Sequence, residues 1–195
     1  MLADQFKDKK IILASKSPRR KELLQELGFQ FDVIVSNTDE HINLNLSFGE
    51  IAEQLARQKV LSVAHLAPED AIIIGGDTIV CVNEKILGKP KNHQEAFEML
   101  KMLSDNTHKV ISSVCIKYQD KILVNHDIAK VHFKTLTDEE INFYIKQYSP
   151  FDKAGAYGIQ EWIGLRAIDK IEGSFYTIMG FPTHLVYQMM EDILY

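Results

Sequence analysis

One segment constrains the fold more than any other: residues 71–82 (AIIIGGDTIVCV) are almost entirely apolar and rich in β-branched side chains. Continuous runs of this kind are typical of buried strands. The run is interrupted by the sequence Gly-Gly-Asp-Thr at positions 75–78. Because glycine inside a strand often marks a bend or a close approach of another group, we predict two strand pieces separated by a kink at a functional position.

Helix signals alternate with further strand-like runs along the chain. A capping residue followed by glutamate three positions later predicts helix starts at Ser47, Asn92 and Thr137. Another helix is expected after Ser17, because the proline that follows is favoured at the first helical position. Strand-like runs cover residues 11–14, 31–35, 110–118, 122–133 and 165–171. This alternation predicts an α/β fold, a mixed β-sheet flanked by helices.

Length and charge narrow the class of protein. A chain of 195 residues with 46% apolar content has enough material for one globular domain, which we place at residues 1–195. The 22 Lys and Arg residues against 27 Asp and Glu residues give a net charge of −5. We therefore expect neither nucleic acid nor an anionic membrane as a partner.

The sequence also indicates where the protein resides. No stretch approaches the ~20 consecutive apolar residues of a membrane span, and residues 1–10 lack the apolar centre of a signal peptide. Cys81 and Cys115 both lie in apolar runs, which favours buried free thiols in a reducing compartment over a disulfide. A cytoplasmic location is expected.

The sequence Ser-Lys-Ser-Pro-Arg-Arg at positions 15–20 combines hydroxyls and cations at a helix start. Free backbone N–H groups and the helix dipole favour an anion there, and guanidinium groups bind phosphate oxygens in pairs. The alternative is an ordinary N-cap followed by solvated cations. Neither the Walker pattern nor the dinucleotide fingerprint is present, so we predict a phosphate site of another kind.

Asp77 places a carboxylate inside the apolar run, where an uncompensated charge would be costly. Such a group can hold a divalent cation or accept a proton from water. The alternative is an aspartate bonded to backbone N–H groups in a bulge. Taken singly, Lys59, Lys89 and Glu40 are ordinary solvated charges or turn residues.

Residues 152–160 (DKAGAYGIQ) form a loop with two glycines and an amide at its end. Such a loop can press its backbone against a base and let Gln160 hydrogen-bond to that base. The alternative is a plain glycine-rich connection. The seven histidines show no zinc-binding spacing.

Four motifs together resemble the Maf family of nucleoside triphosphate pyrophosphatases over nearly the whole chain. They lie at residues 13–24 (LASKSPRRKELL), 75–78 (GGDT), 87–90 (LGKP) and 152–160 (DKAGAYGIQ). The last motif resembles the branch that prefers dTTP and UTP over the branch associated with 7-methyl-GTP. The resemblance implies hydrolysis between the α- and β-phosphates, with a divalent cation as cofactor and a house-cleaning role on pyrimidine nucleotides.

The resemblance also implies a fold and roles for single residues. The fold is like that of the inosine triphosphatases, a mixed sheet flanked by helices in two lobes around a central cleft, and it is often a homodimer. Asp77 is the implied proton acceptor. The implied ligands of the triphosphate are Ser15, Arg20, Lys59 and Lys89; those of Mg²⁺ or Mn²⁺ are Glu40 and Asp77; and Arg19, Thr78 and Gln160 are linked to substrate preference.

Two other functions fit the same residues. The first is a nucleotide-binding regulator, of cell division for example, with little or no catalysis. The second is a phosphate-binding module in which Asp77 is only structural. An Asp77→Asn variant separates them, because it abolishes turnover in an enzyme, leaves a regulator's nucleotide response intact and unfolds a chain that needs Asp77 structurally.

Overall fold

The computed structural model describes residues 1–35, 42–43 and 45–194. Its strands are β1 (Ile11–Leu13), β2 (Asp32–Val33), β3 (Ile72–Val82), β4 (Lys85–Leu87), β5 (Thr107–Tyr118), β6 (Lys121–Phe133) and β7 (Ile168–Glu172). Its α-helices are α1 (Pro18–Glu26), α2 (Phe48–Ala64), α3 (His93–Leu103), α4 (Asp138–Tyr148), α5 (Trp162–Ala167), α6 (Phe175–Met179) and α7 (Thr183–Asp192). Three 3-10 turns complete the order: η1 (Leu2–Phe6), η2 (Pro150–Asp152) and η3 (Ala154–Ala156). Across this part of the chain, no helix has the length and apolar character needed to span a bilayer.

The strands form one mixed sheet, as the alternation of elements predicts. Its order is β2-β1-β3-β5-β6-β7, and β4 pairs with β3. β1 runs parallel to both β2 and β3, whereas β3 with β4 and β6 with β7 are antiparallel. The predicted α/β class is therefore confirmed.

The chain divides into two compact units, each with its own core. Unit 1 comprises residues 1–77, 112–127 and 180–195, and unit 2 comprises residues 78–111 and 128–179. Strands β3, β5 and β6 contribute residues to both units. The two units agree with the expected two lobes. The expectations of a single domain over residues 1–195 and of a central cleft remain predictions.

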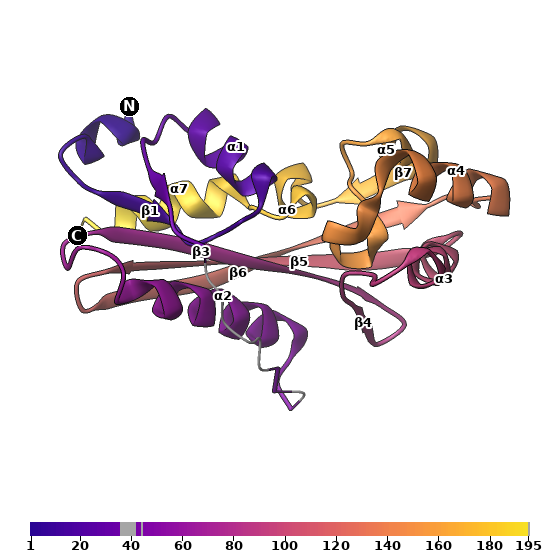
Figure 1. The fold of residues 1–195 in the computed structure, drawn as a ribbon, viewed down its shortest axis with the longest axis horizontal. Helices are drawn as coiled ribbons and strands as arrows, with labels where there is room; N and C mark the ends of the chain where they lie inside the picture. Colours follow the sequence, from indigo (N-terminus) through magenta and orange to yellow (C-terminus); the bar gives the residue numbers. More distant parts are fainter. Residues whose placement is uncertain (36–41, 44, 195) are drawn as a thin grey trace. The chain divides into compact units, whose positions relative to one another are not determined.

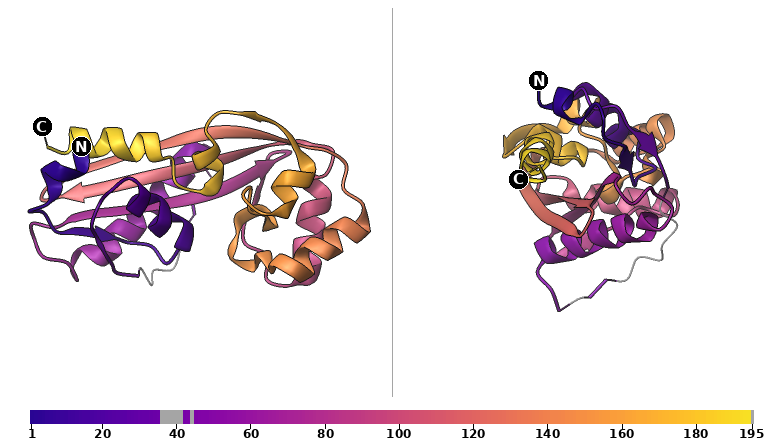
Figure 2. Two further views of the ribbon diagram at one scale, coloured as in Figure 1. Left: turned by 90° about the horizontal axis from the view of Figure 1, so that it is seen from above. Right: turned by 90° about the vertical axis from the view of Figure 1, so that its left-hand side faces the viewer.

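In unit 1, α2 covers one face of the strands, and α1 and α7 lie on the other (Figures 1 and 2). The α2 face is lined by small and branched side chains, including Ala56, Val60 and Val63, which pack on Ile12 and Ile73. α2 starts at the predicted capping box, because Ser47 accepts the Glu50 backbone N–H and the Glu50 carboxylate accepts the Ser47 N–H. This packing fixes the helix face that carries Lys59.

Unit 2 has a core built from its strands together with α3, α4 and the loop after α4. The core includes Val80, Val82, Leu87, Ala96, Leu100, Leu103, Val110, Ala129, Val131, Phe133, Leu136, Ile141, Tyr144, Ile145, Ala156, Tyr157, Ile159 and Ile163. The starts of α3 and α4 at Asn92 and Thr137 agree with prediction. Because Ala156, Tyr157 and Ile159 belong to this core, the glycine-rich loop is part of the packed structure.

Both cysteines are buried free thiols, as predicted. Burial raises the pKa of Cys81 to about 11 and that of Cys115 to about 12. At neutral pH both are therefore protonated and weakly nucleophilic.

Two local predictions are wrong. The sequence Gly-Gly-Asp-Thr does not kink the chain, because β3 runs without a break from Ile72 to Val82. The run at 165–171 is not one strand: α5 continues to Ala167, and β7 begins only at Ile168. The buried residues Ile163 and Ala167 are spaced one helical turn apart, a period that outweighs the β-branched character of the run.

His108 predicts a specific pH dependence of stability. It is 1% exposed, its Nε2 lies 2.7 Å from the Tyr157 hydroxyl, and its Nδ1 has no hydrogen-bond partner among the residues that the structure describes. Burial lowers the pKa of His108 to about 3, against 6.5 for the free side chain. Between these two values the His108 imidazole is protonated in the unfolded chain and neutral in the folded chain. The free energy of unfolding therefore falls as the pH drops from 6.5 towards 3.

The contribution at pH 5 is about 2 kcal/mol, from 1.36 kcal/mol per pH unit. Urea unfolding at pH 7 and pH 5 measures it, with His108→Gln as the variant that cannot titrate. We expect the wild type to lose about 2 kcal/mol more than the variant over this interval. Equal losses in the two proteins would contradict a buried neutral imidazole.

Candidate active site

The first site element is the turn from β1 into α1. Ser17 caps α1 by accepting the Arg20 backbone N–H at 3.4 Å, and Pro18 occupies the first turn. Ser15 precedes the cap and accepts the Ser17 N–H at 3.2 Å. Ser15 and Arg20 are buried at 8% and 9% exposure, whereas Lys16 is exposed. The turn therefore presents one buried hydroxyl and one buried cation.

Arg20 is fixed by contacts from distant parts of the chain. Its Nε donates to the Gly180 carbonyl at 2.9 Å, and its Nη1 donates to the Ser15 hydroxyl at 3.4 Å. A Cβ at Gly76 would lie 3.5 Å from this Nε. The Arg20 guanidinium group therefore packs next to Gly76, the residue before Asp77.

Asp77 is compensated by Lys59, which explains how a carboxylate is tolerated inside β3. The Lys59 ammonium forms an ion pair with Asp77 Oδ1, and the two side chains are only 14% and 12% exposed. The Ser113 hydroxyl donates to the Ala52 carbonyl at 2.6 Å and lies 3.5 Å from the Asp77 carbonyl. Strand β5 therefore ties α2 to β3 beside this ion pair.

The glycine before Asp77 serves close packing. Gly76 has no positive φ, but a Cβ there would lie 2.6 Å from the Ser113 carbonyl oxygen. The absent side chain allows β5 and Arg20 to approach β3. Unit 1 therefore holds two pairs of groups, Ser15 with Arg20 and Lys59 with Asp77, whose chemical types can bind phosphate oxygens and accept a proton.

In unit 2, a backbone hydrogen bond links the two segments that carry Lys89 and Gln160. Lys89 is exposed in the loop after β4, and the preceding Gly88 carbonyl accepts the Gly155 N–H at 3.0 Å. Gln160 is exposed at the end of the same 152–160 loop. The Lys89 loop and the Gln160 loop are thus held to each other.

Three predicted site residues remain: Arg19, Thr78 and Glu40. Arg19 is half-buried in α1 of unit 1, and Thr78 is half-buried in the unit 2 part of β3. Both make interactions of their own. Glu40, the second predicted metal ligand, lies outside the described residues.

The Asp77 carboxylate is of the chemical type that binds a hard divalent cation. Over residues 1–35, 42–43 and 45–194, no three His, Cys, Asp or Glu side chains form a group able to hold a metal ion. Mg²⁺ is usually bound through one or two carboxylates together with substrate phosphates and water. Asp77 carries such a hard oxygen ligand, on a side chain that is 12% exposed and paired with Lys59.

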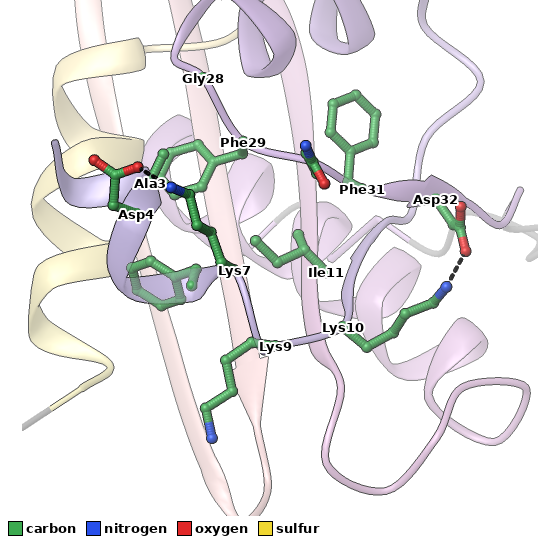
Figure 3. Close-up of a pocket in the computed structure, with 12 residues that line it drawn as sticks. Ala3, Asp4, Lys7, Lys9, Lys10, Ile11, Gly28, Phe29, Phe31 and Asp32 are labelled. Atoms are coloured by element: carbon green, nitrogen blue, oxygen red, sulfur yellow. Dashed lines mark hydrogen bonds and ion pairs between the residues drawn. The ribbon is translucent and has the colours of Figure 1, made fainter.

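A pocket of about 300 Å³ lies apart from these residues, between η1 and the strands β1 and β2 (Figure 3). It has three lysines, but each has a partner. Lys7 pairs with Asp4 at 2.7 Å, Lys10 pairs with Asp32, and Lys9 donates to the Tyr118 hydroxyl at 2.9 Å. Because these cations are already engaged, we assign no anion site to this pocket.

Several contributing residues were missed by the sequence reasoning. Gly180 is 160 positions from Arg20, and Ser113 lies in β5, outside every motif noted in the sequence. Lys153 was part of a noted loop but was not singled out, although its side chain is only 9% exposed. No local pattern marks such residues, because their roles come from contacts made across the fold.

Comparisons with known proteins show the family and the fold of this chain. The family described as "Maf-like protein" matches residues 10–193. The dTTP/UTP pyrophosphatase of Flavobacterium johnsoniae is 44% identical over 194 residues, covering 100% of both chains. That of Aquifex aeolicus is 41% identical over 184 residues, covering 94% of this chain and 95% of the relative. The structure of the Staphylococcus aureus Ham1 protein matches with a TM-score of 0.50 at 16% identity, over 95% of this chain and 100% of that one, which shows a shared fold.

Proposed function

Because the chain belongs to the Maf family, we propose that it is a pyrophosphatase that hydrolyses dTTP and UTP to the nucleoside monophosphate and pyrophosphate. The observation that carries this proposal is the buried ion pair of Asp77 with Lys59, directly after Gly76, the residue on which the Arg20 guanidinium packs. The names of the relatives, dTTP/UTP pyrophosphatases, support the choice of base. The proposed cellular role is the removal of modified or excess pyrimidine nucleotides.

The cations of the site bind the triphosphate. Arg20 is oriented by Gly180 and Ser15, so its guanidinium meets phosphate oxygens with little loss of side-chain freedom. Lys59 exchanges part of its contact with Asp77 for a phosphate oxygen. Lys89 is exposed on a loop held by the Gly155 N–H and neutralises further phosphate charge.

Asp77 accepts the proton of the attacking water. When Lys59 turns to the phosphate, the Asp77 carboxylate regains a lone pair for this proton. The water oxygen attacks the α-phosphorus, and pyrophosphate leaves with the electrons of the α–β bridging bond. General bases of this type contribute about 10²–10⁴-fold to the rate.

Mg²⁺ or Mn²⁺ would be held by Asp77 and Glu40 together with the phosphates. Such an ion would supply positive charge for the leaving pyrophosphate. A carboxylate bound directly to a cation is a weak base, so one of the two roles of Asp77, metal ligand or proton acceptor, would be indirect. Glu40 enters this proposal through the family resemblance alone.

The base is read by Gln160, with Arg19 and Thr78 as further determinants. A carboxamide presents a donor and an acceptor side by side. Uracil and thymine offer the complementary pair, the N3–H donor and a neighbouring carbonyl acceptor. Exposure of Gln160 at the end of a buried loop supports this role.

A cytoplasmic location and a homodimer complete the proposal. The two reduced, buried thiols support the location. The homodimer rests on the family resemblance.

A panel of nucleoside triphosphates with Mg²⁺ or Mn²⁺ tests the function, with monophosphate and pyrophosphate both quantified. We expect dTTP and UTP to give the two products in equal amounts. Turnover of 7-methyl-GTP alone would keep the reaction and refute the proposed base. Nucleotide binding without turnover under either metal would replace the enzyme by a nucleotide-binding regulator.

A further inference from the structure

The loop that carries Gln160 is held in a strained conformation. Residues 155–159 are buried, whereas Gln160 is exposed. Gly155 and Ala156 have positive φ values of 68° and 59°. A non-glycine residue in this region carries a conformational cost and persists where surrounding contacts hold it. The contacts around this loop therefore fix the position of Gln160.

The hydroxyl of Tyr144, in α4, holds the loop on both sides of Gln160. It accepts the Gly158 N–H at 3.0 Å and donates to a carboxylate oxygen of Glu161. Tyr144 is 0% exposed. Burial, together with the Glu161 carboxylate, raises the pKa of Tyr144, so the hydroxyl keeps its proton and remains a donor.

Lys153 joins the start of the loop to its end. Its ammonium lies 3.1 Å from Glu161 Oε1 and 2.8 Å from Asp152 Oδ1. The Lys153 and Glu161 side chains are 9% and 17% exposed, so each supplies the counter-charge that the other needs when removed from water. A Cβ at Gly158 would lie 2.9 Å from the Glu161 carboxyl carbon, which shows how closely this carboxylate packs on the loop.

A second ion pair fixes the helix that follows. Arg166 in α5 donates from Nε and Nη2 to both carboxylate oxygens of Glu140 in α4, at 2.5 and 3.1 Å. α4 therefore holds the chain on both sides of Gln160, through Tyr144 at Gly158 and through Glu140 at Arg166.

We propose that Tyr144, Lys153 and Glu161 are positioning residues that fix the backbone on both sides of Gln160 and thereby set selectivity for the pyrimidine base. This inference rests on the proposed function, in which Gln160 contacts the base. Hydrogen bonds weaken steeply with distance and angle, so a carboxamide discriminates between bases only when its backbone is held in place. The three residues act through the loop and make no contact with substrate.

The test removes only the Tyr144 hydroxyl, by Tyr144→Phe. We expect the ratio of kcat/KM for UTP to that for CTP to fall about tenfold, the effect of misplacing one hydrogen-bonding group. kcat for UTP should change less than about threefold, because the phosphate-binding residues are untouched. A ratio is independent of the folded fraction, so a general loss of structure does not mimic this result.

Two further variants sharpen the test. Tyr148 stacks on Tyr144 in the same helix, with ring centroids 5.1 Å apart, and Tyr148→Phe should leave the ratio unchanged. Glu161→Ala should lower the ratio as Tyr144→Phe does. The double variant should lower it by less than the product of the two single effects, because the two groups share the contact between the Tyr144 hydroxyl and the Glu161 carboxylate.

Amide hydrogen exchange separates this inference from the proposed function. In Tyr144→Phe without nucleotide, the amides of residues 158–160 should exchange about tenfold faster or more than in the wild type. A wild type that hydrolyses no nucleoside triphosphate would refute the proposed function. Amide hydrogen exchange would still test whether the Tyr144 hydroxyl holds the loop. A selective wild type whose Tyr144→Phe variant keeps both its base ratio and its exchange rates would overturn the inference.

Discussion

Replacing Asp77 by asparagine is expected to lower kcat for dTTP and UTP by about 10²–10⁴-fold, the usual contribution of a general base. Asparagine fills the same space but cannot take the proton of water. The affinity for nucleotide should fall little, because Lys59 and Arg20 are retained. Steady-state kinetics and equilibrium binding of dTTP, measured on the same preparation, separate the two effects.

The fold should survive this substitution. The Lys59 side chain is 14% exposed, and its ammonium can bond to the new amide oxygen. Asp120→Asn provides the matched control, since Asp120 is exposed in the turn between β5 and β6, and its kcat should equal that of the wild type. An Asp77→Asn variant with more than a tenth of wild-type kcat would contradict the role of Asp77 as the proton acceptor.

Gly76→Ala is expected to damage both stability and catalysis. The added Cβ would lie 2.6 Å from the Ser113 carbonyl oxygen, so β3 or β5 must shift. Overpacking of this kind typically costs about 1–3 kcal/mol. A displacement of about 1 Å beside Asp77 lowers kcat by about 10²-fold. Urea unfolding and steady-state kinetics measure the two effects.

Gly88→Ala is the control for the stability effect. At Gly88 an added Cβ meets no heavy atom within 4 Å, and its φ is not positive. The free energy of unfolding should therefore stay the same or rise by about 0.4–1 kcal/mol through the stiffer unfolded chain. Equal destabilisation by the two substitutions would show that Gly76 is not required for close packing.

The helix starts could be predicted because their signals are local. At Ser47 and Thr137 the capping residue and the glutamate three positions later satisfy each other's backbone N–H groups, whatever the rest of the chain does. The mixed sheet followed from the alternation of these helices with apolar runs. The same local reasoning failed at Gly75 and Gly76, where packing against Val60 and Ser113 keeps an apparent breaker in an extended strand.

Candidate site residues could be singled out one by one from the sequence, but the way the structure arranges them could not be predicted. The apolar surroundings of Asp77 required a compensating charge, yet nothing in the sequence named Lys59 in a separate helix as that partner. Arg20 was identifiable at a helix start, whereas its acceptor Gly180 was not. Tyr144 had only the pattern of a core residue. Periodicity and caps describe single elements, and these pairings depend on how the elements pack.

The most direct test of the account is hydrolysis of dTTP in water enriched in ¹⁸O, followed by mass spectrometry of both products. Attack on the α-phosphorus by water activated at Asp77 places the label in thymidine monophosphate and leaves pyrophosphate unlabelled. Label in pyrophosphate would mean attack on the β-phosphorus and would contradict the proposed mechanism.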